Sequence, residues 1–198
     1  MIILSIYRAS YIQRSKSIFI NRLSFSFIVC YFLSACTINA PDGILPVDNF
    51  QPNRYMGKWY EIARLYHPFE QGLSNVSAQY KLLPNGNIEV MNKGYNTDTK
   101  QWQNITGLAK FINKSTIGSL KVSFFWPFYG GYHVVNLDKE NYSWAIVIGP
   151  TKKYLWILAR DKTLPAELLN QLINKISKLG IDTNKLIWVS QDHPNKGQ

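Results

Sequence analysis

The chain has 198 residues, 46% of them hydrophobic and 14% aromatic, and a formal net charge of +10. This length suits one domain plus a targeting segment, and the composition supplies a hydrophobic core and excludes an intrinsically disordered chain. The basic residues are scattered rather than gathered in one block, which excludes the charge pattern of a nucleic-acid groove. A surface near anionic membrane headgroups explains them better.

The first 35 residues have the pattern of a secretion signal. They carry basic residues and no acid, then an apolar run over residues 23–33 that ends in small residues. The run is shorter than the roughly 20 apolar residues of a membrane span, so we expect a signal peptide over residues 1–35. Cys30 would leave with this peptide, so Cys36 would remain alone and no disulfide would form within one molecule.

The end of the apolar run also predicts an anchor. Leu33-Ser34-Ala35-Cys36 resembles the lipobox of bacterial lipoproteins, which implies cleavage before Cys36 and lipidation of Cys36. Thr37 differs from the Asp that resembles an inner-membrane retention signal. We therefore expect a protein that is lipid-anchored in the outer membrane and faces the periplasm.

Proline and glycine, without any sustained period, mark the next stretch. Such a composition is typical of a linker, so we assign residues 36–52 to a lipidated N-terminus and linker. The folded domain should cover residues 53–192, followed by a tail over 193–198.

The domain begins at Gly57-Lys58-Trp59. A glycine two residues before a tryptophan lets the backbone enter a strand beneath a large indole ring, because glycine has no Cβ to clash. From Trp59 the period is two, which puts Glu61 and Ala63 on the same face as Trp59.

Further alternating segments follow at short intervals, and Asn85-Gly86 suits a tight hairpin turn. Residues 127–131 are interpreted as a break between strands. A three- and four-residue apolar spacing predicts a helix over 165–179, followed by a short strand over 186–189. The main strands are expected at residues 59–65, 76–83, 87–95, 102–112, 119–126, 132–137, 144–148 and 154–160.

Sequential antiparallel strands with short loops most simply form a closed barrel that is wide enough for one small ligand. We therefore predict an all-β fold: an eight-stranded antiparallel up-and-down barrel, a C-terminal α-helix packed outside it and a short ninth strand. The inward positions and one strand junction define an expected ligand wall. Its members are Glu61, Ala63, Val76, Ala78, Tyr80, Asn92, Ala109, Phe111, Val122, Phe124, Tyr129 and Trp156.

Several motifs, in order, resemble the bacterial outer-membrane lipoprotein lipocalins over residues 49–191. They lie at residues 57–64, 92–96, 120–125, 127–132 and 154–158. The resemblance implies a fatty acid or lysophospholipid as ligand, to be bound and stored or transported. It also implies that Arg160 contacts Trp59, beside Gly57, where the barrel closes. Residues 141–144 match the family's second motif, Thr-Asp-Tyr, only loosely.

Two other functions stay open at this point. A lipocalin-fold enzyme would use Glu61 as a general base with a raised pKa, and a tetrapyrrole binder would use His67 or His133. The sequence has no metal-ligand spacing, nucleophile elbow or nucleotide-binding fingerprint. We therefore expect a binding protein with no catalytic residues, no metal and no cofactor, and leave a homodimer open.

Overall fold

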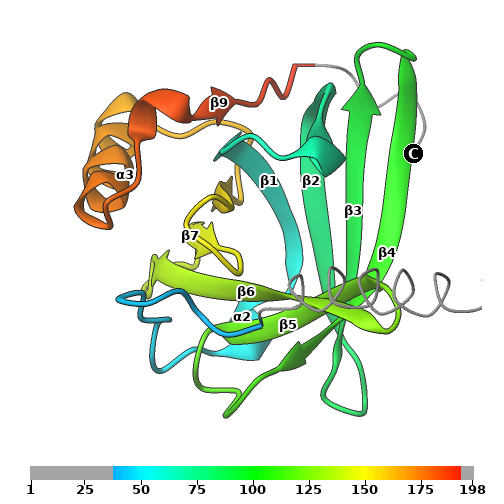
Figure 1. The fold of residues 1–198 in the computed structure, drawn as a ribbon, viewed down its shortest axis with the longest axis vertical. Coiled ribbons are helices and arrows are strands. Elements are labelled where there is room, and N and C mark those ends of the chain that lie inside the picture. Colours follow the sequence, from blue (N-terminus) through cyan, green and yellow to red (C-terminus); the bar gives the residue numbers. More distant parts are fainter. Residues whose placement is uncertain (1–37, 193–198) are drawn as a thin grey trace, which may run out of the picture. The chain divides into compact units, whose positions relative to one another are not determined.

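The structure is a computed structural model that describes residues 38–192, and its strands form one antiparallel sheet that closes on itself (Figure 1). The sheet order is β2-β3-β4-β5-β6-β7-β8-β1-β9, and β1 also pairs with β2, which closes the barrel. The strands are β1 (Gly57–Arg64), β2 (Leu73–Leu82), β3 (Ile88–Asn96), β4 (Gln101–Phe111), β5 (Ser119–Phe125), β6 (Phe128–Leu137), β7 (Trp144–Ile148), β8 (Leu155–Ala159) and β9 (Ile187–Trp188). The predicted barrel and its short ninth strand are confirmed.

The C-terminal helix α3 (Ala166–Lys178) packs outside the barrel, as predicted. Its buried residues Leu172 and Ile176 are four positions apart and therefore lie on one face of the helix. Three shorter elements complete the described chain: helix α2 (Pro52–Tyr55) and the 3₁₀ helices η1 (Pro68–Glu70) and η2 (Thr183–Lys185). No helix within residues 38–192 is both long and apolar enough to span a membrane.

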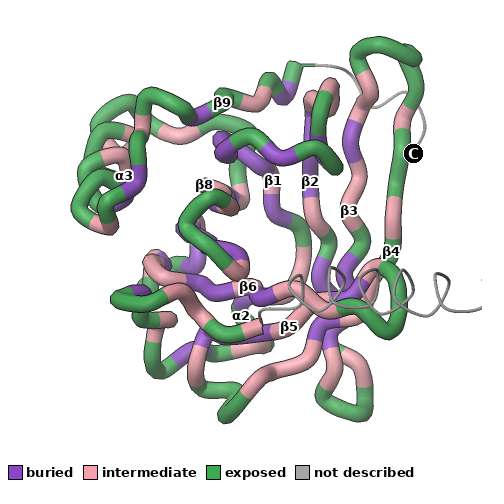
Figure 2. The backbone as a smooth tube through the Cα atoms, in the orientation of Figure 1, coloured by how far each residue is buried: buried purple, intermediate pink, exposed green. Residues whose placement is uncertain are grey.

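The barrel wall separates two apolar layers. In β7, Ala145 and Val147 belong to the layer inside the barrel, whereas Ile146 and Ile148 belong to the layer beneath α3. This is the two-residue period of a strand that is covered on both faces. Where only one face is covered, as along β3, buried positions alternate with more exposed ones (Figure 2).

Trp59 and Arg160 meet at the closed end of the barrel. The Arg160 guanidinium carbon lies 3.9 Å from the Trp59 ring centroid, a cation–π contact. The Arg160 side chain also donates to the carbonyl oxygens of Lys58, Arg54 and Met56, each at 2.8 Å. Gly57 has φ +91°, and a Cβ there would lie 3.4 Å from Arg160 Nη1, so a larger residue would be strained at this position.

The segment before β1 is not a free linker over its whole length. Ile44 and Phe50 are buried, and the backbone N–H of Val47 donates to the carbonyl oxygen of Val134 at 2.8 Å. The expected linker 36–52 is therefore wrong from residue 44 onward, because apolar side chains between its prolines pack against the barrel. The predicted signal peptide, Cys36 and the tail 193–198 lie outside the described residues.

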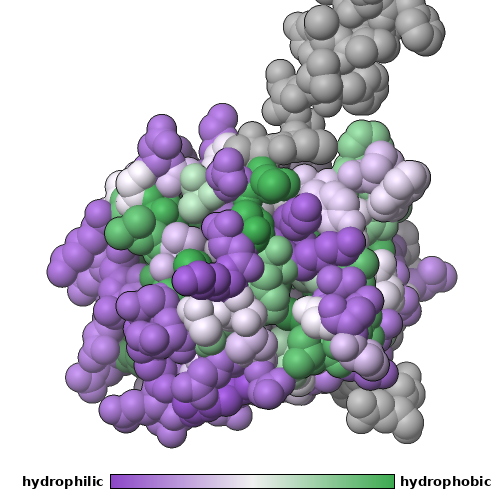
Figure 3. Space-filling view, turned by 90° about the horizontal axis from the view of Figure 1, so that it is seen from below, coloured by the Kyte–Doolittle hydropathy of each residue, from purple (hydrophilic) through white to green (hydrophobic). Residues whose placement is uncertain are grey.

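The expected break over residues 127–131 is also wrong, because β6 begins at Phe128. A register shift between Val122 and Phe125 lets the hairpin between β5 and β6 continue pairing through Gly130 and Gly131. The face of the molecule in Figure 3 is mainly hydrophilic, with hydrophobic residues dispersed over it.

Candidate functional site

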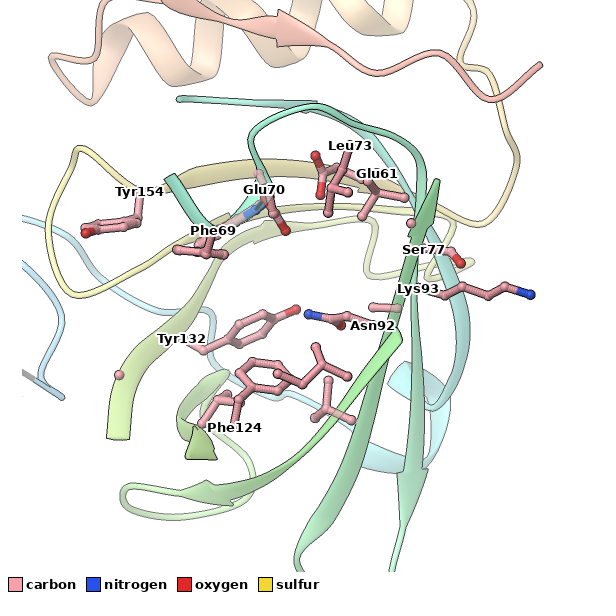
Figure 4. A pocket seen from close by; sticks show the side chains of 18 of the residues that line it. Glu61, Phe69, Glu70, Leu73, Ser77, Asn92, Lys93, Phe124, Tyr132 and Tyr154 are labelled. Carbon is pink, nitrogen blue, oxygen red and sulfur yellow. Dashed lines mark hydrogen bonds between the residues drawn. The ribbon is translucent and has the colours of Figure 1, made fainter. Parts of the chain in front are cut away.

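The barrel encloses a central cavity of about 660 Å³. Its wall is mostly apolar and comes from β1 to β6 and β8, with the loops before β2 and β8. Labelled side chains converge on it from several strands (Figure 4). Cavities of this size and character are typical of small-molecule sites.

Most of the expected ligand wall lines the central cavity. The predicted residues found there are Glu61, Val76, Ala78, Tyr80, Asn92, Val122, Phe124 and Trp156. These residues were predicted from the two-residue period of each strand, which identifies the side chains that point into the barrel. Four others, Ala63, Ala109, Phe111 and Tyr129, do not line the cavity.

Ala63 and Tyr129 point elsewhere for different reasons: a bulge displaces Ala63, and Tyr129 lies on the other face of a strand rather than at the expected strand junction. A bulge in β1 between Glu61 and Ala63 turns Ala63 into the layer beneath α3. Tyr129 lies within β6, where Lys121 Nζ is 5.2 Å from its ring centroid. Neither side chain reaches the cavity.

Ala109 and Phe111 belong to the layer inside the barrel but lie below the cavity. Ala109 is buried there, and Phe111 packs edge-on against Phe50 with ring centroids 6.3 Å apart. Phe50, Tyr55 and Trp59 fill this end of the barrel. The depth of the cavity floor thus depends on the segment that precedes the first strand.

Three tyrosines form a hydrogen-bonded group at the border of this filled end. The Tyr132 hydroxyl is 2.7 Å from the Tyr55 hydroxyl and 2.9 Å from the Tyr80 hydroxyl. Burial raises the pKa of Tyr80 to about 12 and raises the pKa values of Tyr55 and Tyr132 well above their ordinary value. All three phenols therefore stay neutral. Tyr132 lines the cavity and was missed because its strand was predicted without assigning its inward face.

A buried charged group occupies another part of the wall. Arg64 Nη1 donates to Glu61 Oε1 at 2.6 Å, and Trp156 Nε1 donates to Glu70 Oε2 at 3.1 Å. Glu61 and Glu70 both line the cavity. Glu70 lies in η1 and was missed because nothing in its neighbouring sequence predicts that a loop carboxylate turns inward.

Burial controls the protonation of this group. It raises the pKa of Glu61 to about 8, helped by the nearby Glu70 charge, and these effects outweigh the opposing pull of Arg64. Burial likewise raises the pKa of Glu70. The pKa of His67 falls to about 4 through burial and the positive charge of Arg64, so His67 is neutral at pH 7.

Neither histidine considered for a tetrapyrrole lines the central cavity. His67 is buried, with its ring stacked on Phe69 at 4.2 Å between centroids. His133 Nδ1 is 2.9 Å from the Ser119 hydroxyl on the outer side of the wall. The positions of these rings give a tetrapyrrole site no support.

Aromatic side chains surround one end of the cavity. Phe69, Phe125 and Phe128 line it and yet are 64%, 71% and 57% exposed. Trp126, between the latter two, is 84% exposed. These residues mark the open mouth, on the opposite side of the cavity from the filled end.

Comparison with known proteins gives strong sequence relatives. A family model described as a lipocalin-like domain matches residues 50–191. The chain is 48% identical over 164 residues to outer membrane lipoprotein Blc of Vibrio cholerae, covering 83% of this chain and 96% of the relative. It is 46% identical over 162 residues to Blc of Escherichia coli, covering 81% and 91%, and 36% identical over 152 residues to apolipoprotein D of Macaca fascicularis, covering 74% and 79%.

Solved structures of low sequence identity share the fold. Insecticyanin from the tobacco hornworm Manduca sexta has a TM-score of 0.63 and 24% identity, covering 80% of this chain and 88% of that one. The cockroach allergen Per a 4 has a TM-score of 0.60 and 18% identity, covering 79% and 94%.

Proposed function

Because the chain belongs to the lipocalin family, we propose that it binds a single-chain lipid, a fatty acid or a lysophospholipid, in the central cavity. The observation that carries this proposal is the apolar cavity of about 660 Å³ with a mouth rimmed by exposed aromatic residues. Its polar groups are few and lie at particular points of the wall, which suits a long acyl chain with one polar end.

The proposed role is storage or transport of this lipid at a membrane. The lipobox-like ending at Cys36 and the printed names of the bacterial relatives, which are outer membrane lipoproteins, support anchoring at the periplasmic face of the outer membrane. Several acyl chains on one cysteine would make attachment effectively permanent, since each buried CH₂ contributes about 0.8 kcal/mol. A Cys36→Ala protein should leave the membrane fraction. Its retention there with unchanged processing would refute the anchor.

Binding rather than catalysis fits the buried carboxylates. Glu61, the residue considered as a general base, already accepts a hydrogen bond from Arg64. The bacterial proteins that are similar to this chain in sequence are named as lipoproteins. The proposed function therefore assigns Glu61 to the polar part of a binding site.

The test is to identify what the protein carries. Protein purified from membranes should yield single-chain lipids when its organic extract is read by mass spectrometry, and delipidated protein should bind palmitate or palmitoyl lysophospholipid in a saturable way. Trp156 lines the cavity, so ligand should change tryptophan fluorescence. An extract without lipid, together with no saturable binding by any single-chain lipid, would refute the proposed function.

A further inference from the structure

An amide interrupts the apolar wall of the central cavity. Asn92 lines the cavity from β3, at the inward position between Val90 and Gly94. Within residues 38–192, the Asn92 side chain forms no hydrogen bond. Its carbonyl oxygen and its two N–H groups are therefore open to whatever fills the cavity.

The Tyr132 hydroxyl faces this amide. In Figure 4 the two side chains point toward each other, Tyr132 from β6 and Asn92 from β3. They do not hydrogen-bond to each other, because the partners of the Tyr132 hydroxyl are the Tyr55 and Tyr80 hydroxyls. A ligand atom between Asn92 and Tyr132 would contact both.

The three tyrosines have one hydrogen-bond donor to spare. Their neutral hydroxyls carry three protons, and the two contacts at 2.7 and 2.9 Å use two of them. Within the described part of the chain these hydroxyls have no further acceptor. If Tyr132 donated to a ligand oxygen, it would accept from both Tyr55 and Tyr80, and every phenol proton would be bonded.

An unsubstituted acyl chain cannot satisfy these groups. Its CH₂ groups would displace water from the amide and the hydroxyl while offering neither a donor nor an acceptor. Sites that hydrogen-bond a ligand hydroxyl reject the analogue that lacks it, because their own polar groups are then left unpaired. A hydroxyl on the chain removes this cost, since it accepts from Tyr132 and donates to the Asn92 carbonyl oxygen.

The depth of Asn92 selects the middle of a chain rather than its first carbons. β3 reaches the mouth side at Asn96, which pairs with Leu73, the first residue of β2 after η1. Asn92 lies four residues deeper, about 13 Å at the strand rise of roughly 3.3 Å per residue. A chain that enters from the mouth therefore brings its middle carbons to Asn92.

We infer that the cavity holds a mid-chain hydroxyl between Asn92 and Tyr132, and so selects hydroxylated acyl chains over unsubstituted ones. This inference rests on the proposed lipid-binding function. It concerns the part of the chain inside the barrel, whichever headgroup the lipid carries.

The experiment compares fatty acids of one chain length. Stearate has no hydroxyl, 2-hydroxystearate has one beside the carboxylate, and 10-hydroxystearate and 12-hydroxystearate have one near the middle. Titration calorimetry of the delipidated, full-length protein should show about tenfold tighter binding for the better mid-chain acid than for stearate, the scale of a satisfied against an unpaired polar group. The acid with its hydroxyl beside the carboxylate should bind within about twofold of stearate, which separates hydrogen bonding in the cavity from a general effect of a more polar ligand.

Variants assign the preference to the two polar side chains. Asn92→Leu should bind stearate more tightly than the unchanged protein does, and should bring the mid-chain acids within about twofold of stearate. Tyr132→Phe should reduce the preference independently, which provides a second test if Asn92→Leu folds poorly. Gln79→Leu is the matched control, since Gln79 is exposed on β2, pairs with Met91 and loses its amide outside the barrel.

The outcomes separate this inference from the function on which it rests. Stearate binding as tightly as both mid-chain acids, or a preference that persists in both variants, overturns the hydroxyl site and leaves lipid binding intact. Failure of all four acids and of palmitoyl lysophospholipid to bind overturns the proposed function itself. A preference that is lost in the Asn92 and Tyr132 variants, and kept in Gln79→Leu, supports the inference.

Discussion

The two ends of the barrel hold their charged side chains in opposite ways. At the closed end, Arg160 lies over Trp59 and donates to several backbone carbonyl oxygens, so its hydrogen-bonding capacity is used within the protein. At the open end, Glu61 and Glu70 share one guanidinium beside an open cavity. The closed end therefore contributes to stability, whereas the charged groups of the open end lie where a ligand could contact them.

Trp59→Ala should cause the largest loss of stability and so tests the role of the closed end. Trp59 is fully buried at the closed end, and removal of a buried tryptophan typically costs about 3–5 kcal/mol. That is a large part of the roughly 5–15 kcal/mol by which domains are stable, so the variant should unfold at much lower temperature or denaturant concentration. An unchanged melting temperature would contradict the closed end described above.

Phe50→Ala should have the next largest effect. Its ring is buried and packs against Tyr55 at 5.1 Å between centroids, so the expected loss of unfolding free energy is about 3 kcal/mol. The matched control is Leu45→Ala, since Leu45 lies in the same segment and is 84% exposed. Equal urea midpoints for the two variants would restore the view that this segment is a linker.

Phe50 also shows where sequence reasoning ends. Alternation located the strands and their inward faces, because a two-residue period is local information. The linker interpretation failed because burial of Phe50 depends on a distant site, where its backbone N–H donates to the carbonyl oxygen of Thr116. Because the sequence does not show that Phe50 fills the closed end of the barrel, it could not predict that Ala109 and Phe111 lie below the cavity floor.

Other misses have equally specific causes. The β1 bulge reverses the face of Ala63, and no pattern in the sequence signals that extra residue. The aromatic and glycine run over residues 127–131 is typical of a loop, yet ladder pairing with β5 continues through it. Glu70 could not be predicted as a cavity residue, because the direction of a loop side chain depends on how the loop packs on the complete barrel.

At the open end, protonation of Glu61 should make the stability of the protein depend on pH. The folded-state pKa of Glu61 is about 8, against an ordinary value of 4.5, so between these values the folded protein keeps a proton that the unfolded chain has lost. Stability should therefore fall as the pH rises and level off above about 8. His67, whose pKa is lowered to about 4, acts oppositely, but only below pH 6.5.

The informative window for this prediction is thus pH 6.5–8. Arg64 and Glu70 are the charged groups that act on Glu61, His67 Nδ1 lies 3.2 Å from Glu70 Oε2, and Tyr80 stays neutral throughout this window. Glu61→Gln should flatten the slope and raise stability at pH 8.5 by about 1 kcal/mol or more, since one pKa unit corresponds to about 1.4 kcal/mol. Denaturant melts of ligand-free protein across this window measure it, and identical slopes in both proteins would refute the proton held by Glu61.

The smallest effect on stability, and the sharpest effect on binding, should come from filling the cavity at Gly130. A Cβ at Gly130 would have no heavy atom within 4 Å, and Gly130 lines the cavity, so Gly130→Trp can enter free space without strain. Unfolding free energy should change by less than about 0.5 kcal/mol, while palmitate and lysophospholipid binding should be lost. Met91→Trp is the control, because Met91 is 40% exposed on β3 and this variant places the same indole group outside the barrel. If Gly130→Trp folds normally and binds these lipids as tightly as Met91→Trp does, the acyl chain does not occupy the central cavity, and the open end must serve another purpose.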